Sequence, residues 1–225
     1  MRWLRGLCRT LRLPLQGNRG GADGMITNII IAGVGGQGVV TAGLLLSEAA
    51  TIRGMHVVMS EIHGLAQRGG SVSVDVRIGE VYGSIIGRGD ADLIIGFEPI
   101  ETMRAIARAG NKTQVIMNSE KITPVSLSMH DKEYPSNADL TSMVDKSIKI
   151  REINAVSLAK KAGSYKSVNT VIIGAAIGLG ILPFEKDDML SALKNRFSGK
   201  LYDINREALG YGMDEILSNQ SVSLS

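Results

Sequence analysis

The sequence predicts an α/β fold, with a mixed and mostly parallel sheet flanked by helices and a helical C-terminal part. Three observations support this prediction. An apolar run over residues 26–32 leads through a glycine turn into a helical pattern over 37–53, which is the order of a buried strand, a tight turn and a helix. Short apolar runs then alternate with helical patterns as far as residue 162. Beyond residue 169, apolar residues recur at helical spacing.

The glycine turn joins the first strand to the first helix. Three of its glycines have the G-x-G-x-x-G spacing, which permits the turn, a close approach of ligand to backbone, and tight packing of helix on strand. The N-terminus of the helix presents unpaired N–H groups to an anion. We therefore interpret the fold as Rossmann-like, with a phosphate-bearing ligand on the turn; a turn that only packs is the alternative. The candidate binding residues are Gly33, Gly35, Gly36, Gln37 and Gly38.

The other elements are predicted from apolar patterns between turn residues. Residues 71–78 alternate between apolar and polar side chains, which predicts an antiparallel strand with one covered face. Gly79 and Glu80 then turn the chain into a second hairpin strand over 81–86. Further strands are expected over 56–60, 92–97, 113–118, 124–129 and 147–153, and helices over 99–109, 138–145, 154–162 and 169–182, before two final helices.

Charge separates the N-terminal residues from the rest of the chain. Residues 1–24 hold five arginines and one acidic residue. They are predicted to be a disordered or non-native extension, with Met25 as the natural start. We expect one domain over 25–218 and a C-terminal tail over 219–225. The whole chain has 25 Lys and Arg against 22 Asp and Glu, so the part after residue 24 is nearly neutral and gives no electrostatic case for a nucleic-acid partner.

Composition also limits the membrane, redox and metal chemistry. The apolar stretch over 169–182 is shorter than the roughly 20 residues of a membrane span, so we expect a buried helix and no membrane partner. Cys8 is the one cysteine in the chain, whereas an iron–sulfur cluster needs about four thiolates. The three histidines lack the spacing of metal ligands, so no metal site is expected. A reducing, cytoplasmic setting is compatible with these features.

A second polar loop is expected directly after the second strand, over residues 61–70. An acid at this place holds a ribose hydroxyl in dinucleotide-binding folds, so a free-standing NAD(P)-dependent oxidoreductase is one alternative, with Glu61 as its evidence. Arg68, which glycines follow, suits a carboxylate or phosphate; a solvated loop with a structural arginine is the other interpretation. The catalytic candidates are His63, Gln67 and Arg68, and the further binding candidates are Glu61, Gly69 and Gly70.

Residues 31–38 and 60–72 together resemble the gamma-type domain of 2-oxoacid:ferredoxin oxidoreductases. The His-Gly-x-Ala-Gln-Arg-Gly-Gly version of the second motif is similar to the beta subunits of the indolepyruvate type. Residues 87–93, 96–99 and 169–171 extend the resemblance, which spans about Met25 to Ser218. Leu65 stands where methionine is expected most often, and residues 1–24 lie outside the match.

The resemblance implies a thiamine-diphosphate-dependent complex that oxidatively decarboxylates aryl pyruvates, forms acyl-CoA and reduces ferredoxin. It implies that a large partner subunit carries the thiamine diphosphate and the 4Fe-4S clusters. This chain would then be the non-redox subunit, inactive alone and without a bound cofactor of its own, and coenzyme A would be a co-substrate that the glycine turn meets. A regulatory nucleotide-binding module remains a non-enzymatic alternative.

Overall fold

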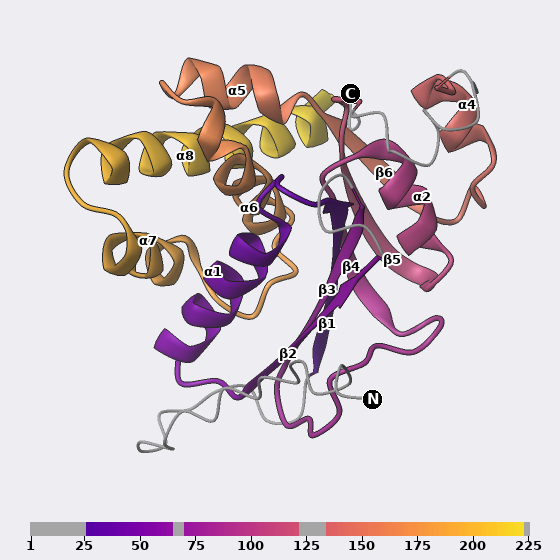
Figure 1. Ribbon diagram of the computed structural model, residues 1–225, viewed down its shortest axis with the longest axis horizontal. Coiled ribbons are helices and arrows are strands. Elements are labelled where there is room, and N and C mark those ends of the chain that lie inside the picture. The colour runs from indigo at the N-terminus through magenta and orange to yellow at the C-terminus, as the bar shows by residue number, and fades with distance from the viewer. Residues whose placement is uncertain (1–25, 65–69, 122–133, 223–225) are drawn as a thin grey trace, which may run out of the picture.

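A six-stranded sheet runs through the middle of the molecule (Figure 1), in the strand order β2-β3-β1-β4-β5-β6. The computed structural model describes residues 26–64, 70–121 and 134–222. The strands of the sheet are β1 (Thr27–Val34), β2 (Val57–His63), β3 (Ser71–Ile78), β4 (Ala91–Gly96), β5 (Ala109–Asn118) and β6 (Lys149–Ile153).

Strand direction places most strand ends at one edge of the sheet. The pairs β1–β4, β4–β5 and β5–β6 are parallel, whereas β3 is antiparallel to both β1 and β2. Among the described strands only β3 runs against the others, so the predicted mixed, mostly parallel sheet is confirmed. The carboxyl ends of β1, β2, β4, β5 and β6 therefore share one edge, which we call the carboxyl edge.

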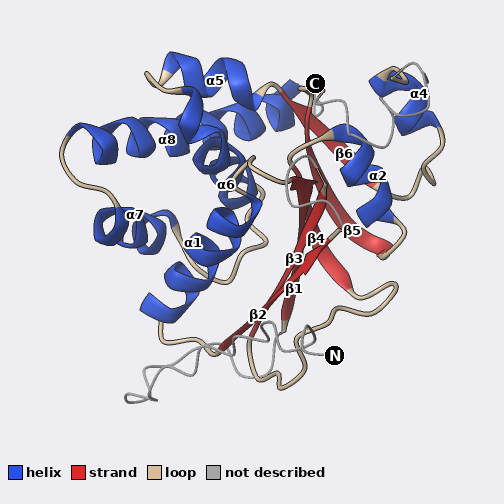
Figure 2. Ribbon diagram, in the orientation of Figure 1, coloured by secondary structure: helices blue, strands red, loops and turns tan. Residues whose placement is uncertain are grey.

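Helices cover the two faces of the sheet unequally. Figure 2 shows α1 and the helices from α5 to α8 on one face, and α2 on the other. This arrangement fits the predicted helical C-terminal part, because the late helices pack together rather than alternating with strands. The helices are α1 (Val39–Ile52), α2 (Pro99–Ile106), α4 (Asn137–Ser142), α5 (Ala155–Lys161), α6 (Val168–Gly178), α7 (Lys186–Arg196) and α8 (Lys200–Val222), with a 3₁₀ turn at Tyr165–Ser167.

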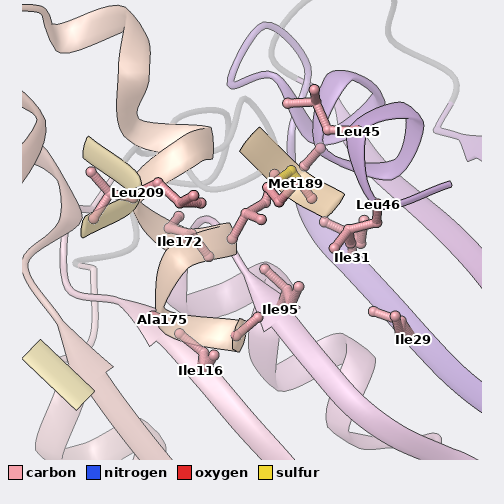
Figure 3. Close-up of a cluster of buried hydrophobic side chains, with 14 of the residues drawn as sticks. Ile29, Ile31, Leu45, Leu46, Ile95, Ile116, Ile172, Ala175, Met189 and Leu209 are labelled. Carbon is pink, nitrogen blue, oxygen red and sulfur yellow. The ribbon is translucent and has the colours of Figure 1, made fainter. Parts of the chain in front are cut away.

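The larger hydrophobic core lies between the sheet and the late helices. Alternate strand residues point to opposite faces, so Ile29 and Ile31 of β1 join this core while Ile30 joins a smaller core on the α2 face. Figure 3 shows β1, β4 and β5 meeting side chains of α1, α6, α7 and α8. Strands that are apolar on both faces are typical of sheets covered on both sides.

Glycines, among them Gly174 and Gly178, let α6 and α8 approach closely. A Cβ added at Gly174 would collide with the carbonyl oxygen of Leu209, and one at Gly178 would lie 3.1 Å from that of Met213. The approach is reciprocal, because a Cβ on Gly212 of α8 would collide with the carbonyl oxygen of Val171. The backbone of each helix thus fills the space that a side chain on the other would need.

The predicted hairpin strand over 81–86 is wrong. This stretch lies in an irregular connection between β3 and β4, which a buried ion pair fastens to the sheet. Asp75 of β3 is fully buried and accepts hydrogen bonds from Arg108 (Nη1 to Oδ1, 2.9 Å) and from the Ile86 N–H (2.9 Å). Arg108 also donates to the Ile86 carbonyl oxygen (Nε, 3.2 Å). β3 already pairs with β1 and with β2 on its two sides, so side-chain bonds from Asp75 and Arg108, and not a strand ladder, hold the stretch after the Gly79-Glu80 turn.

Several boundaries differ from those expected. β2 continues through His63, so the first residues of the expected loop over 61–70 belong to a strand. α8 extends to Val222, past the boundary at residue 218 that was expected for the tail. The extension over 1–24 and the expected strand over 124–129 lie outside the described residues.

Candidate functional site

The glycine turn sits at the carboxyl edge and is built by backbone conformations that favour glycine. Gly36 has φ of 99° and Gly38 has φ of 85°, a region that other residues rarely adopt. Gly33 is restricted by packing instead, since an added Cβ would lie 2.8 Å from Phe97 Cβ. The Gly35 N–H donates to the carbonyl oxygen of Gly70 at 2.9 Å. The turn is therefore joined directly to the far end of the second motif.

The side chain of Gln37 makes hydrogen bonds within the turn and to the residue after β4. Its Oε1 accepts a hydrogen bond from the Val34 N–H (2.7 Å) and its Nε2 donates to the Phe97 carbonyl oxygen (3.0 Å). The Gln37 side-chain amide thus joins the turn to the residue that follows β4. Both its oxygen and its nitrogen take part in these hydrogen bonds. This geometry supports a positioning role for Gln37, in place of the direct ligand contact expected from the sequence.

The turn leaves a set of backbone donors free. α1 has Gly38 as its N-cap, and no side chain caps it. Ala42 is the first residue of the helix whose N–H finds a carbonyl, that of Gly38. Within the described residues, the N–H groups of Gly36, Gly38, Val39, Val40 and Thr41 have no hydrogen-bond partner. Free N–H groups at a helix N-terminus carry positive partial charge and suit an anion.

Glu61 and His63 lie on β2, and β3 stands between β2 and the strand that leads into the glycine turn. They face the same side of β2, and Glu61 Oε2 lies 3.1 Å from His63 Nε2. β3 separates β2 from β1, so β2 is about two strand spacings, or roughly 10 Å, from β1. An acid that binds the ribose of a dinucleotide normally ends the strand beside the first. The topology therefore counts against the NAD(P) interpretation of Glu61.

Of the other predicted site residues in the segment between β2 and β3, the structure describes Gly70 and not residues 67–69. The Gly64 N–H donates to the Ser71 carbonyl oxygen (2.8 Å), and Gly70 receives the bond from Gly35. Gly64 and Gly70, which flank this segment, therefore both lie at the carboxyl edge, beside the glycine turn. Gln67, Arg68 and Gly69 themselves lie outside the described residues.

Two buried acids at the start of α2 were missed from the sequence. Glu98 is the N-cap of α2, and its Oε2 accepts from the Glu101 N–H (3.0 Å), while the Tyr134 hydroxyl donates to its Oε1. Glu101 accepts from Ser71 Oγ (2.6 Å), the first residue of β3, and from Arg104 (2.6 Å). Glu98 directly follows the apolar run of β4, which was the available signal for a residue at the carboxyl edge.

A buried asparagine at the end of β5 was also missed. Asn118 Nδ2 donates to the Phe97 carbonyl oxygen (3.2 Å), which Gln37 also uses, and Asn118 Oδ1 accepts from the Ala155 N–H (3.1 Å) at the start of α5. The ends of β4 and β5, the glycine turn and α5 are thus joined in one polar network. Satisfied buried networks of this kind hold a site rigid.

Burial raises the pKa of Glu98 above its ordinary value of 4.5, because desolvation of the carboxylate outweighs the hydrogen bonds from Tyr134 and Glu101. The folded state therefore binds this proton more tightly than the unfolded state does, so wild-type stability should fall as pH rises from 4.5 through the raised pKa. Glu98→Gln cannot titrate. Its free energy of unfolding, measured by chemical denaturation, should improve relative to wild type as pH rises from 4.5 through the raised pKa of Glu98. A relative loss over that range would contradict the assignment.

The fold defines a class of protein. Its architecture matches the keto/oxoacid ferredoxin oxidoreductase gamma subunit of Geobacter sulfurreducens, with TM-score 0.63 and 23% identity over 85% of this chain and 99% of that one. It also matches part of the 2-oxoglutarate:ferredoxin oxidoreductase of Magnetococcus marinus, solved with coenzyme A bound, with TM-score 0.66 and 19% identity over 86% of this chain and 31% of that one. A family model described as pyruvate ferredoxin/flavodoxin oxidoreductase matches residues 28–215, and the chain belongs to this family.

Relatives with higher sequence identity are subunits of indolepyruvate oxidoreductases. The indolepyruvate oxidoreductase subunit IorB of Methanothermobacter thermautotrophicus is 41% identical over 188 residues, which are 82% of this chain and 96% of that protein. The IorB subunit of Thermococcus kodakarensis is 36% identical over 189 residues, or 83% and 94% of the two chains. The predicted class, a small subunit of a 2-oxoacid:ferredoxin oxidoreductase, is confirmed.

The helices were also compared with the requirements of a membrane span. None of those in the described part of the chain combines the length and the apolar character needed to cross a bilayer.

Proposed function

We propose that this chain is the non-redox subunit of an indolepyruvate-type oxidoreductase, which converts an aryl pyruvate and coenzyme A to acyl-CoA. In that reaction the carboxylate leaves as carbon dioxide, the acyl group joins the CoA sulfur, and the released electrons pass to ferredoxin. The observation that carries the proposal is the hydrogen bond from Gly35 to Gly70. It brings the two motifs that are similar to IorB subunits to one edge of the sheet.

We propose that this chain and a large partner subunit have separate roles in a cytoplasmic complex. The large partner carries the thiamine diphosphate and the 4Fe-4S clusters, and ferredoxin accepts its electrons. The single cysteine of this chain, Cys8, supports this division because a cluster needs about four thiolates. Coenzyme A is the ligand proposed for the glycine turn, where the free N–H groups of α1 suit its phosphates. A relative of the same fold, the Magnetococcus enzyme, was solved with coenzyme A bound.

The loop between β2 and β3 is proposed to face the partner's active site. Both of its ends are fixed at the carboxyl edge, where open α/β sheets bind ligands. We propose Arg68 as its main electrostatic contact, to the oxoacid carboxylate or a CoA phosphate, with His63 and Gln67 as further polar contacts. The Glu61 carboxylate lies 3.1 Å from the His63 ring nitrogen and would orient the imidazole.

Reconstitution tests this function. The chain purified alone should be colourless and inactive, and mixing it with the large subunit should give indolepyruvate- and CoA-dependent ferredoxin reduction. Arg68→Ala should still assemble but raise the apparent Michaelis constant for CoA or oxoacid about ten- to a hundredfold, which is the cost of a lost charge-assisted bond. Arg68→Lys should recover only part, because an ammonium lacks the planar fork.

The control is Arg206→Ala, which removes an exposed arginine of α8 that pairs with exposed Asp203 and lies over the Tyr202 ring. It should leave the kinetics unchanged. Turnover of NAD(P) by the chain alone would contradict the proposed function. Unchanged kinetics for Arg68→Ala in the reconstituted complex would remove Arg68 from the site, and the loop would then be an assembly surface.

A further inference from the structure

Glu101, in the first turn of α2, has a buried carboxylate that bonds across to the sheet. Only 2% of the residue is exposed, yet its Oε2 accepts a hydrogen bond from Ser71 Oγ at 2.6 Å and its Oε1 accepts one from Arg104 Nη1, also at 2.6 Å. An acid at the third residue of a helix often turns back to cap its own N-terminus. In α2 the side chain of Glu98 is the cap, and the Glu101 carboxylate serves the bond to β3.

Ser71, the serine of this bond, is the residue at which the two motifs meet. It is the first residue of β3 and stands opposite Val34, the last residue of β1 before the glycine turn. Its carbonyl oxygen accepts from the Gly64 N–H at 2.8 Å. The carbonyl oxygen of the preceding residue, Gly70, accepts from the Gly35 N–H at 2.9 Å. The backbone at residues 70 and 71 therefore closes the second motif and joins it to the glycine turn.

The bond to Glu101 restrains this backbone from the α2 side of the sheet. A hydroxyl that donates to a carboxylate forms a short, charge-assisted bond of about 2.5–2.7 Å, and the Ser71–Glu101 bond has this length. Because only one side-chain torsion separates the serine Oγ from the backbone, holding Oγ also restrains the adjacent backbone. α2 thereby restrains the position of the Gly70 carbonyl oxygen, on which the bond from Gly35 depends.

A buried carboxylate is a costly means of holding two elements together. Desolvation of the charge opposes its burial, and an apolar residue of similar size would often stabilise a fold as well or better. The side chain of Arg104 is 53% exposed, so water weakens the compensation that it offers. What an apolar residue at position 101 could not supply is the acceptor for Ser71. The position of Ser71, and not stability, is therefore what distinguishes Glu101 from an apolar residue.

We propose that Glu101 is a positioning residue for the glycine turn, acting through Ser71 and the hydrogen bond from Gly35 to Gly70. The inference rests on the proposed function for the identity of the ligand, coenzyme A, which the turn would bind. Glu101 makes no contact with that ligand in this proposal. It keeps the turn in its binding shape, so its loss should weaken CoA binding and leave the chemical step unchanged.

The test measures CoA kinetics in the reconstituted complex with the large subunit in excess. Ser71→Ala and Glu101→Leu each remove one end of the bond, and each should raise the apparent Michaelis constant for CoA about three- to tenfold, the range for one lost hydrogen bond. The double variant should give no further rise, because both single variants remove the same interaction. Ser71→Thr keeps the hydroxyl in a residue that suits a strand, and it should bind CoA like wild type. Additive effects of the two single variants would overturn the proposal.

The readout separates positioning from stability. A purely structural role would lower the amount of active complex, and hence the apparent kcat, without changing the Michaelis constant for CoA. In the variants we expect the opposite, an unchanged kcat and an unchanged Michaelis constant for the oxoacid. Ser136→Ala is the matched control, because it breaks another serine–carboxylate bond, to Asp139 at the exposed cap of α4. It should leave the CoA kinetics as in wild type.

Hydrogen exchange in the full chain alone tests the linkage without the proposed function. The Gly35 amide, which donates to Gly70, should exchange faster in Ser71→Ala and Glu101→Leu than in wild type or Ser136→Ala. Unchanged Gly35 exchange would overturn the positioning role, and so would an unchanged Michaelis constant for CoA in both variants of an active complex. Faster Gly35 exchange in the variants, together with a wild-type complex that does not use CoA, would instead contradict the proposed function alone.

Discussion

Arg108→Met should lower the free energy of unfolding by about 3–5 kcal/mol, the range for removing one partner of a buried ion pair. Asp75 is fully buried in β3, and Arg108 bonds to both of its carboxylate oxygens. The variant would leave this charge with only the Ile86 N–H as a donor. Arg108 also holds the Ile86 carbonyl oxygen, so the connection between β3 and β4 should loosen as well. Urea denaturation measures the loss.

Two further variants distinguish the cost of an unpaired buried charge from the cost of replacing an arginine in general. Arg206→Met removes an arginine whose pair with Asp203 is about half exposed on both sides, and it should change stability by less than about 1 kcal/mol. Adding Asp75→Asn to Arg108→Met removes the stranded charge while an amide oxygen remains for the Ile86 N–H. The double variant should therefore be more stable than Arg108→Met alone. A double variant that is less stable would contradict the charge-burial explanation.

Gly212→Ala should destabilise the domain by about 2–3 kcal/mol or more, the cost of forcing a methyl group into a well-packed site. Its new Cβ would collide with the Val171 carbonyl oxygen and lie 2.9 Å from the Ala175 N atom. Both neighbours belong to the α6 backbone, which cannot move aside as a flexible side chain could. The helices must separate, and the core that α8 shares with α6 through Leu209 and Ile172 must loosen.

Gly210→Ala is the matched control, since it makes the same change in the same helix. A Cβ at Gly210 would have no neighbour within 4 Å. Alanine has the better helix propensity, so this variant should gain up to about 1 kcal/mol. Thermal denaturation of the two variants compares them directly. Equal effects at the two positions would show that α6 and α8 do not approach as closely as the structure indicates.

Local patterns were sufficient for most of the elements. β1 and α1 were predicted because an apolar run, a glycine turn and a helical period follow one another without interruption. The alternation of apolar and polar residues over 71–78 likewise predicted an antiparallel strand, which is β3. The hairpin over 81–86 was not correct, because β3 pairs with β1 on one side and with β2 on the other, which leaves it no open edge for residues 81–86. Pattern within a segment carries no information about a bond to a residue far along the chain.

The sequence by itself determined the family and predicted the two motifs that meet at the carboxyl edge. The glycine turn and the motif after the second strand were both legible, since each depends on residue types at fixed local spacing. It did not show that β3 lies between β1 and β2, which moves Glu61 away from the turn. It also did not show that both ends of the Gln37 amide bond within the fold, or that Asn169 of α6 lies against Gly38.

Only the tertiary structure decided these points, because each depends on contacts between distant segments. Asn169 of α6 lies against Gly38 at the start of α1, while glycine contacts and the Thr170–Asn205 bond join α6 to α8. Side-chain direction at such a contact is set by packing and by which groups can donate, and not by neighbours in the chain. The sequence therefore determined the residue types of the glycine turn, and the tertiary packing determined which other side chain lies against it.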